Sequence, residues 1–172
     1  GLSVTTGLFL FKRLYMKYPL QTFYKKILAD TITPVSVYLK IRDRFPGSIL
    51  LESSDYHAND NSFSYICCNP IATFRVQGEM LYRTYPDGTS DQMPIGPETD
   101  VALEIHRFAG QFQVEENDFK FINSGLFGYM GYDAVRYFED IRIEKKADSP
   151  EIPDIHYAVY QNIIAINHFK NE

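Results

Sequence analysis

Glu52 is the residue whose neighbours in the sequence most strongly indicate a functional role. It follows the apolar run Ile-Leu-Leu at 49–51 and precedes two hydroxyl side chains, Ser53 and Ser54. A carboxylate at the mouth of a buried strand faces water or pairs with a cation, because burying it alone is costly. Glu52 can therefore bind an ammonium group, and Ser53 can bind a polar head group, as in a small-ligand site. The alternative is a strand end that runs into a loop.

Three glycines, Gly125, Gly128 and Gly131, recur at three-residue spacing in a segment rich in aromatic residues. Glycine allows another backbone or a large ring to approach closely. A phosphate cradle is disfavoured, because no Lys, Ser or Thr follows the glycines. The pattern therefore favours a close-packed strand in the core.

Standard catalytic and metal-binding patterns are absent from the sequence. It has no P-loop, no dinucleotide-binding glycine motif, no H-E-x-x-H and no nucleophile elbow. The acidic loop at 55–62 lacks the alternating ligands of a calcium site. The four histidines are scattered and are expected at the surface or at interfaces: His57, His106, His156 and His168. We therefore predict no catalytic residue, no metal ligand and no cofactor within this chain.

The two cysteines, Cys67 and Cys68, are adjacent. Neighbouring cysteines do not easily satisfy disulfide geometry with each other, and two thiols without further Cys or His ligands do not form a zinc site. They are typical of a reduced, cytoplasmic protein in which both thiols are small buried side chains.

Composition places the chain among folded globular proteins. It has 172 residues, a formal net charge of −5, 45% apolar residues and 15% aromatic residues. The apolar content excludes disorder, and the acidic balance disfavours general nucleic-acid binding. No apolar stretch approaches membrane-spanning length. Gly1 is not a natural start, so we interpret residues 1–15 as a tag remnant or an upstream extension, with Met16 as a candidate start codon.

Local patterns predict an α+β fold, in which a twisted antiparallel sheet packs against a few helices. Thr33-Pro34 starts a helix over 34–44, and Thr99 or Asp100 caps a second helix over 99–110. Strands are expected at 23–28, 48–53, 63–68 (stopped by Asn69-Pro70), 72–76, 79–85, 125–131 and 157–169, with a helical turn at 133–138 and a surface crossover at 141–153.

The last predicted strand, 157–169, is long and lies close to the end of the chain. We expect it at a sheet edge, where a second copy of the chain could pair with it in a homodimer. The residues predicted to be most buried are Leu50, Ile66, Phe74, Phe127 and Ile164.

Four ordered blocks resemble the start of component I, the large subunit, of anthranilate synthase, a chorismate-utilising enzyme. Leu-Leu-Glu-Ser at 50–53 resembles its Leu-Leu-Glu-Ser motif. Ser-Phe-Ser-Tyr-Ile-Cys-Cys-Asn-Pro at 62–70 resembles its Arg-Tyr-Ser-Phe-Ile-Gly-x-Asp-Pro segment. Residues 125–139 resemble its Gly-Leu-x-Gly-Tyr-x-x-Tyr-Asp-x-Val-Arg-x-x-Glu block, and 33–38 match its first helix start. The chain departs from these patterns at Ser62, where a basic residue is expected, and at Cys67, where glycine is expected.

The resemblance implies that residues 16–172 are the N-terminal regulatory domain of such an enzyme, without its chorismate-binding half. Members of the family are lyases that make anthranilate from chorismate and ammonia or glutamine, in tryptophan biosynthesis. Their Mg²⁺ site lies in the other half, and they work with a glutamine amidotransferase subunit, component II. The chain alone is then expected to be inactive.

The resemblance also implies that L-tryptophan, the end product, binds as a feedback inhibitor. The implied ligand-binding residues are Glu52, Ser53, Ser54, Phe63 and Ser64. Leu51 and Tyr65 could line the indole slot together with Phe63. Part of the pocket belongs to the other half, so weak or undetectable tryptophan binding is expected for this chain alone.

Two other interpretations remain open. Component I of aminodeoxychorismate synthase shares the fold and the N-terminal blocks but makes a para-amino product. A stand-alone, non-catalytic module that binds a small molecule would also fit. The reading frame after Glu172 distinguishes these interpretations, because only a synthase continues into the chorismate-binding motifs.

Overall fold

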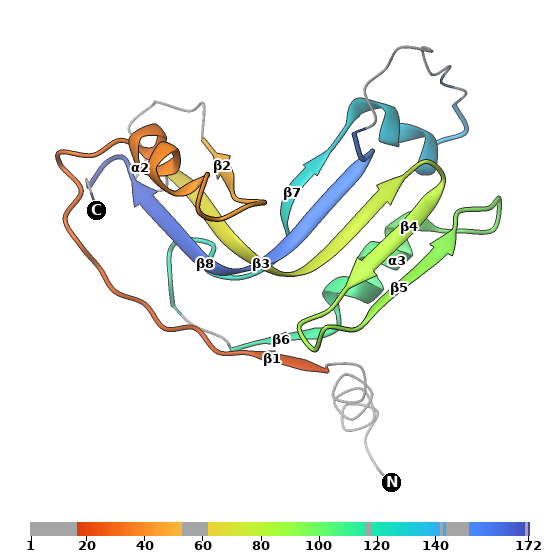
Figure 1. Ribbon diagram of the computed structural model, residues 1–172, viewed down its shortest axis with the longest axis horizontal. Coiled ribbons are helices and arrows are strands. Elements are labelled where there is room, and N and C mark those ends of the chain that lie inside the picture. The colour runs from red at the N-terminus through yellow and green to blue at the C-terminus, as the bar shows by residue number, and fades with distance from the viewer. Residues whose placement is uncertain (1–16, 53–61, 116–117, 142, 144–151, 171) are drawn as a thin grey trace, which may run out of the picture.

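The computed structural model describes residues 17–52, 62–115, 118–141, 143, 152–170 and 172. A six-stranded antiparallel sheet forms its centre, with the strand order β5-β4-β3-β8-β7 and with β2 paired to β3 (Figure 1). Two further strands, β1 and β6, form a small parallel sheet. The elements in chain order are β1 (Tyr18–Leu20), α2 (Pro34–Ile41), β2 (Ile49–Leu51), β3 (Phe63–Gln77), β4 (Met80–Thr84), β5 (Ser90–Pro94), α3 (Val101–Ala109), β6 (Phe112–Val114), β7 (Phe127–Met130), the 3₁₀ helix η1 (Tyr132–Tyr137) and β8 (Ile155–Asn167). The predicted α+β class is confirmed.

The two longest strands, β3 and β8, pair along almost their whole length and curve together through the sheet (Figure 1). The prediction that Asn69-Pro70 ends the first of these strands is wrong. Asn69 adopts a positive φ of 62°, and the pairing register shifts between Pro70 and Ala72. Proline lacks an N–H group, so it fits a strand at such an irregularity. The predicted strands 63–68 and 72–76 are therefore one bent strand.

Both predicted helices begin directly after the predicted capping residues, Thr33 and Asp100. Thr33 accepts a hydrogen bond from Ser36 N, and the Ser36 hydroxyl accepts one from Thr33 N, which completes a capping box. Asp100 caps α3 through Leu103 N. The first helix ends at Ile41 rather than at residue 44.

The segments predicted as strands at 72–76 and 79–85 are joined by a tight hairpin. Gly78 and Glu79 both have positive φ, the two-residue geometry that joins β3 to β4 with the twist of the sheet. Asp87 accepts hydrogen bonds from the backbone and the hydroxyl of Thr89 at the next turn. The predicted strand at 125–131 is present as β7, and the predicted helical turn at 133–138 is present as η1. The described part of the crossover at 141–153 contains no helix or strand, and most of that segment lies outside the described residues.

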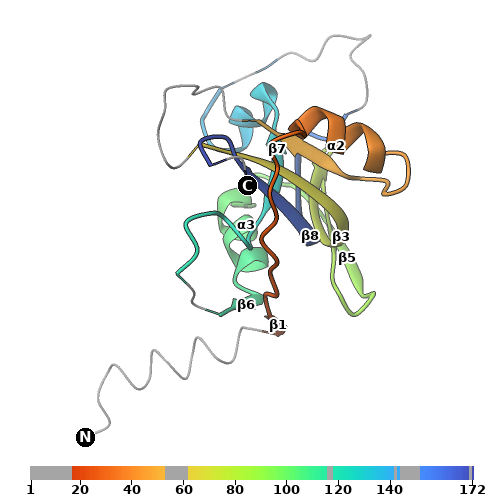
Figure 2. The ribbon, with the colours of Figure 1, turned by 90° about the vertical axis from the view of Figure 1, so that its left-hand side faces the viewer.

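Two hydrophobic cores lie along the curved sheet. The first contains α3 side chains packed on β3, β4 and β8, and it is formed by Ala72, Phe74, Val76, Leu81, Val101, Phe108, Phe112, Ala134, Ile155 and Val159. The second is smaller and is formed by Cys67, Phe127, Ala158 and Tyr160, with Ile49, Leu51, Tyr65 and Ile163 packed against it. Figure 2 shows α2 and α3 at separate places along the sheet.

The burial predictions were right for three of the five residues. Ile66, Phe74 and Phe127 are buried, as expected, but Leu50 is only half-buried and Ile164 is 37% exposed. Leu50 lies in a three-residue strand at the border of the sheet, and Ile164 lies where β8 has no described strand on its outer side. Burial at these two positions depends on neighbouring strands, which an apolar pattern does not specify.

The edge prediction for the last strand is wrong in its first part. β8 lies between β3 and β7 over Ile155–Ala158. Beyond Ala158, β8 pairs only with β3 within the described residues, so its outer side resembles an edge there. The strand expected at 23–28 is absent: this part of the chain is extended but unpaired, and Phe23 and Leu28 are among its exposed side chains. In the part of the chain that the structure describes, no helix has the length and apolar character needed to cross a membrane.

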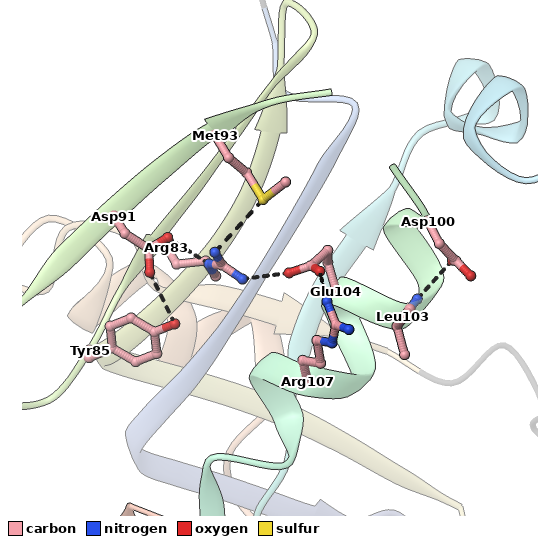
Figure 3. A network of polar contacts seen from close by, with 8 residues as sticks. All are labelled: Arg83, Tyr85, Asp91, Met93, Asp100, Leu103, Glu104 and Arg107. Carbon is pink, nitrogen blue, oxygen red and sulfur yellow. Dashed lines mark hydrogen bonds and ion pairs between the residues drawn. The ribbon is translucent and has the colours of Figure 1, made fainter. Parts of the chain in front are cut away.

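A buried ion-pair network joins α3 to β4 and β5 (Figure 3). Glu104 is 7% exposed, and its two carboxylate oxygens accept hydrogen bonds from Arg83 and Arg107 at 2.6 Å each. Arg83 also pairs with Asp91 at 2.6 Å. The central pair of this network was not predicted, because Arg83 and Glu104 are 21 residues apart in the sequence.

We expect Glu104→Ala to lower the free energy of unfolding by about 3 kcal/mol, because it leaves Arg83 with one of its two ion-pair partners. The Arg107 side chain is 60% exposed, so Arg107→Ala should cost less than about 1 kcal/mol. Urea unfolding of both variants measures the difference. Equal losses would contradict the assignment of Glu104 as the buried centre of the network.

Gly128 is the position where β7 approaches β8 most closely. A Cβ at this residue would overlap the carbonyl oxygen of His156, a backbone atom that cannot swing aside. Gly128→Ala should therefore lower the free energy of unfolding by about 1–3 kcal/mol or more. The matched control is Gly96→Ala, where a Cβ meets nothing within 4 Å, and the change should stay within about 0.5 kcal/mol. Thermal unfolding of the two variants tests this, and similar melting temperatures would contradict it.

Candidate functional site

The predicted site lies where the end of β2, the start of β3 and the end of β8 meet. Leu51 of β2 is opposite Tyr65 of β3, and one further step in this register sets Glu52 opposite Ser64. Glu52 is exposed at the end of β2, as a ligand-binding carboxylate must be. Ser53 and Ser54 lie outside the described residues.

The three described site residues do not share one face of the sheet. Successive side chains of a strand point to opposite faces, so Phe63 and Ser64 point apart. Directly opposite residues share a face, which sets Glu52, Ser64 and Ile166 on one side of the sheet. Phe63 lies on the other side, with Tyr65. The structure thus brings Glu52 and Ser64 together and separates both from the aromatic side chains.

Ser64 is fully buried, at 0% exposure. Its Oγ lies 2.7 Å from Nε2 of His168, and the tautomer of the imidazole decides which of the two atoms donates. From the sequence, His168 was expected to be a surface or interface residue. Its exposed ring agrees with that interpretation, but its contact with Ser64 was missed. Only the register of β3 against β8 could have revealed this contact.

The Phe63 side of the sheet is covered by a chain of aromatic rings. The Phe63 ring centroid lies 6.3 Å from that of Phe121, which in turn stacks on Phe119 at 5.0 Å. Tyr24 meets Phe119 edge to face at 4.6 Å. Tyr65 accepts a hydrogen bond from Ile122 N through its hydroxyl. This face of the sheet is apolar and aromatic, and other side chains of the protein already cover part of it.

Neither cysteine is poised for nucleophilic chemistry. Burial raises the pKa of the Cys67 thiol to about 12, and burial also raises the pKa of Cys68. Both therefore stay protonated near neutral pH. Among the described residues, no group of three or more His, Cys, Asp or Glu side chains could hold a metal ion.

A second buried polar cluster, also missed from the sequence, fixes η1 to the start of β8. Arg136 pairs with Asp154 at 2.7 Å, and the Tyr137 hydroxyl donates to the same carboxylate at 2.8 Å. Burial raises the pKa of Tyr137. Nη1 of Arg136 is buried and has no hydrogen-bond partner among the described residues.

Two surface hollows lie away from the predicted site. One, of about 540 Å³, borders the Arg83–Glu104 network. The other, of about 260 Å³, lies beside Arg136 and the β3–β4 turn. Neither hollow is lined by Glu52, Phe63 or Ser64.

Comparison with known proteins points consistently to one enzyme. No protein-family model matches the chain. Anthranilate synthase component 1 of Lactococcus lactis is 30% identical over 152 residues, which cover 84% of this chain and 29% of the relative. The protein of the same name from Mycolicibacterium smegmatis is 29% identical over 173 residues, covering 98% of this chain and 31% of the relative.

A solved structure was found as well. The crystal structure of anthranilate synthase component I from Streptococcus pneumoniae TIGR4 has a TM-score of 0.48 and 20% identity, over 88% of this chain and 31% of that one. This chain spans about 30% of the length of the relatives it matches. Most of the chain is therefore homologous to the N-terminal part of anthranilate synthase component 1.

Proposed function

We propose that this chain is the regulatory part of an anthranilate synthase component I, and that it binds L-tryptophan as a feedback inhibitor. The single observation that carries the proposal is the homology to this enzyme over most of the chain. The position of Glu52 at an exposed strand end agrees with it. The parent enzyme would make anthranilate from chorismate, with its Mg²⁺ site and its contacts to a glutamine amidotransferase subunit in or near the remaining two-thirds.

Glu52 is the proposed partner of the ligand's ammonium group. Its carboxylate is exposed, so binding requires no prior opening of the sheet. A hydrogen bond between oppositely charged groups is worth roughly 1.5–3 kcal/mol, which is enough to orient a small zwitterion. Ser53 and Ser54 are proposed as donors to the polar head group on the basis of their sequence positions.

Phe63 is the residue that we propose contacts the indole ring of the ligand. It begins β3 and lies on the face opposite Glu52, so a ligand that contacts both residues must extend around the end of the sheet. Its neighbours Phe121 and Tyr65 extend an aromatic surface suited to a flat ring. Ser64 is buried, so we propose it as support for this end rather than as a wall that the ligand touches.

The para-amino branch is the second candidate, because component I of aminodeoxychorismate synthase shares the N-terminal blocks. The product of the complete reading frame that contains this chain separates the two candidates. Incubation with chorismate, ammonia and Mg²⁺ should give anthranilate, which is detected by its fluorescence. A para-amino product would favour the second candidate, and a reading frame without the chorismate-binding motifs would favour a stand-alone binding module.

The tryptophan site is tested in the same full-length protein by Ser53→Phe and Glu52→Gln. The phenylalanine ring overpacks the site at a cost of about 1–3 kcal/mol, equivalent to a roughly tenfold to hundredfold loss of tryptophan affinity. Glu52→Gln removes the charge that binds the ammonium group and should weaken binding by at least about tenfold. The measurements are tryptophan titration by calorimetry and the half-inhibition concentration for anthranilate formation.

Glu98→Gln is the matched control, because Glu98 is an exposed glutamate in the turn before α3. It should leave inhibition unchanged. If Ser53→Phe and Glu52→Gln fold normally and keep the half-inhibition concentration of the wild type, tryptophan does not bind at this end of the sheet.

A further inference from the structure

The contact between Ser64 and His168 joins residues 104 positions apart at the end of the sheet. Phe63 pairs with Asn167 and Ser64 pairs with Ile166, and His168 N donates to Ser62 O at 3.1 Å. The register therefore continues through residues 62 and 168. His168 and Ser64 are diagonal neighbours on the same face, which accounts for the 2.7 Å between Nε2 and Oγ.

The same register puts Glu52 and His168 on either side of Ser64. Glu52 continues β2 on one flank of β3, and His168 follows β8 on the other. Two strand spacings across the sheet and two residues along it separate their backbones, which is about 12 Å. Both residues are exposed, whereas Ser64 between them is fully buried. An acidic side chain and an imidazole thus flank one buried hydroxyl on one face of the sheet.

The backbone around His168 is held in place. The side-chain oxygen of Asn167 accepts hydrogen bonds from Phe169 N and Lys170 N at 2.9 Å each. Asn167 N donates to Glu172 O at 2.8 Å, and the Glu172 carboxylate pairs with Lys26 at 2.6 Å. The imidazole is therefore fixed at its backbone by this turn and at its ring by Ser64.

The direction of the Ser64–His168 hydrogen bond decides which hydrogen-bonding group His168 offers to solvent. When the Ser64 hydroxyl donates to Nε2, the ring proton resides on Nδ1, and Nδ1–H is a donor. Nδ1 has no partner within the described part of the chain. Ser64 itself is too deeply buried to reach a ligand in solution. With the proton on Nδ1, the donor that this face offers to a ligand is the imidazole and not the serine.

We infer that His168 binds the carboxylate of the amino-acid ligand while Glu52 binds its ammonium group, and that Ser64 is the positioning residue that orients the imidazole. This inference rests on the proposed function, since it concerns the same ligand site. It assigns the two charged groups of the zwitterion to residues that directly follow β2 and β8, the two strands that flank β3. Recognition of both charges would make the site selective for a free amino acid over an amine or an amide.

The test compares L-tryptophan with L-tryptophanamide, which keeps the indole and the ammonium group but lacks the carboxylate. Both ligands are titrated calorimetrically into the full-length protein and its variants. In the wild type, tryptophan should bind at least about tenfold more tightly than the amide. His168→Ala should remove this preference by weakening tryptophan alone, whereas Glu52→Gln should weaken both ligands.

Two further variants separate ligand contact from folding. His168→Gln keeps a side-chain acceptor, its amide oxygen, that can receive the Ser64 hydroxyl proton in place of Nε2. It has no N–H group at the position of Nδ1, so it should fold normally and still lose the preference. Ser64→Ala should reduce the preference without abolishing tryptophan binding. His106→Ala is the matched control, because His106 is an exposed histidine on α3, and its preference should equal that of the wild type.

The outcomes distinguish this inference from the proposed function. If the wild type binds neither ligand, the proposed function fails and this inference fails with it. If the wild type prefers tryptophan and His168→Gln keeps the same preference, the inference alone is overturned. Loss of preference in His168→Gln but not in His106→Ala supports it.

Discussion

The antiparallel pairing of β3 with β8 is the constraint on which the rest of the structure depends. It runs from Phe63 opposite Asn167 to Val76 opposite Ile155. Strands β2, β4 and β7 pair directly with one of these two strands, and β5 attaches through β4. Its register shift at Pro70–Ala72 coincides with the positive φ of Asn69, so the long ladder bends and each half faces a separate core. One ladder thereby supports both the α3 layer and the candidate site.

The two halves of the sheet are stabilised in different ways. The half that contains α3 combines a large apolar core with buried ion pairs, in which Glu104 and Asp154 each neutralise an arginine. Buried charges of this kind require close pairing, because an isolated buried charge is very costly. The other half has a small core and an exposed carboxylate at its rim. The exposed carboxylate of Glu52 remains accessible from solvent, as the proposed role of this end of the sheet requires.

The end of the sheet gathers residues from three distant parts of the chain. Glu52 comes from β2, Ser64 from β3 and His168 from the turn after β8. Such a site depends on strand register, since a slip of one residue would turn every side chain to the opposite face. The capped turn around Asn167 and the bond from His168 N to Ser62 O hold that register at its last step.

Local signals in the sequence determined the helices, the hairpin and the tight approach of β7. The Thr33 and Asp100 caps and the positive φ of Gly78 act within a few residues, so their effect is readable without the fold. The family blocks likewise indicated Glu52 as a candidate ligand-binding residue. Only the tertiary structure decided that Asn69-Pro70 bends a strand instead of ending it, because the pairing of β8 along both halves outweighs the local stop signal. It alone also joined Ser64 to His168 and Arg83 to Glu104, since contacts between distant residues follow from strand register and helix packing, which no local pattern encodes.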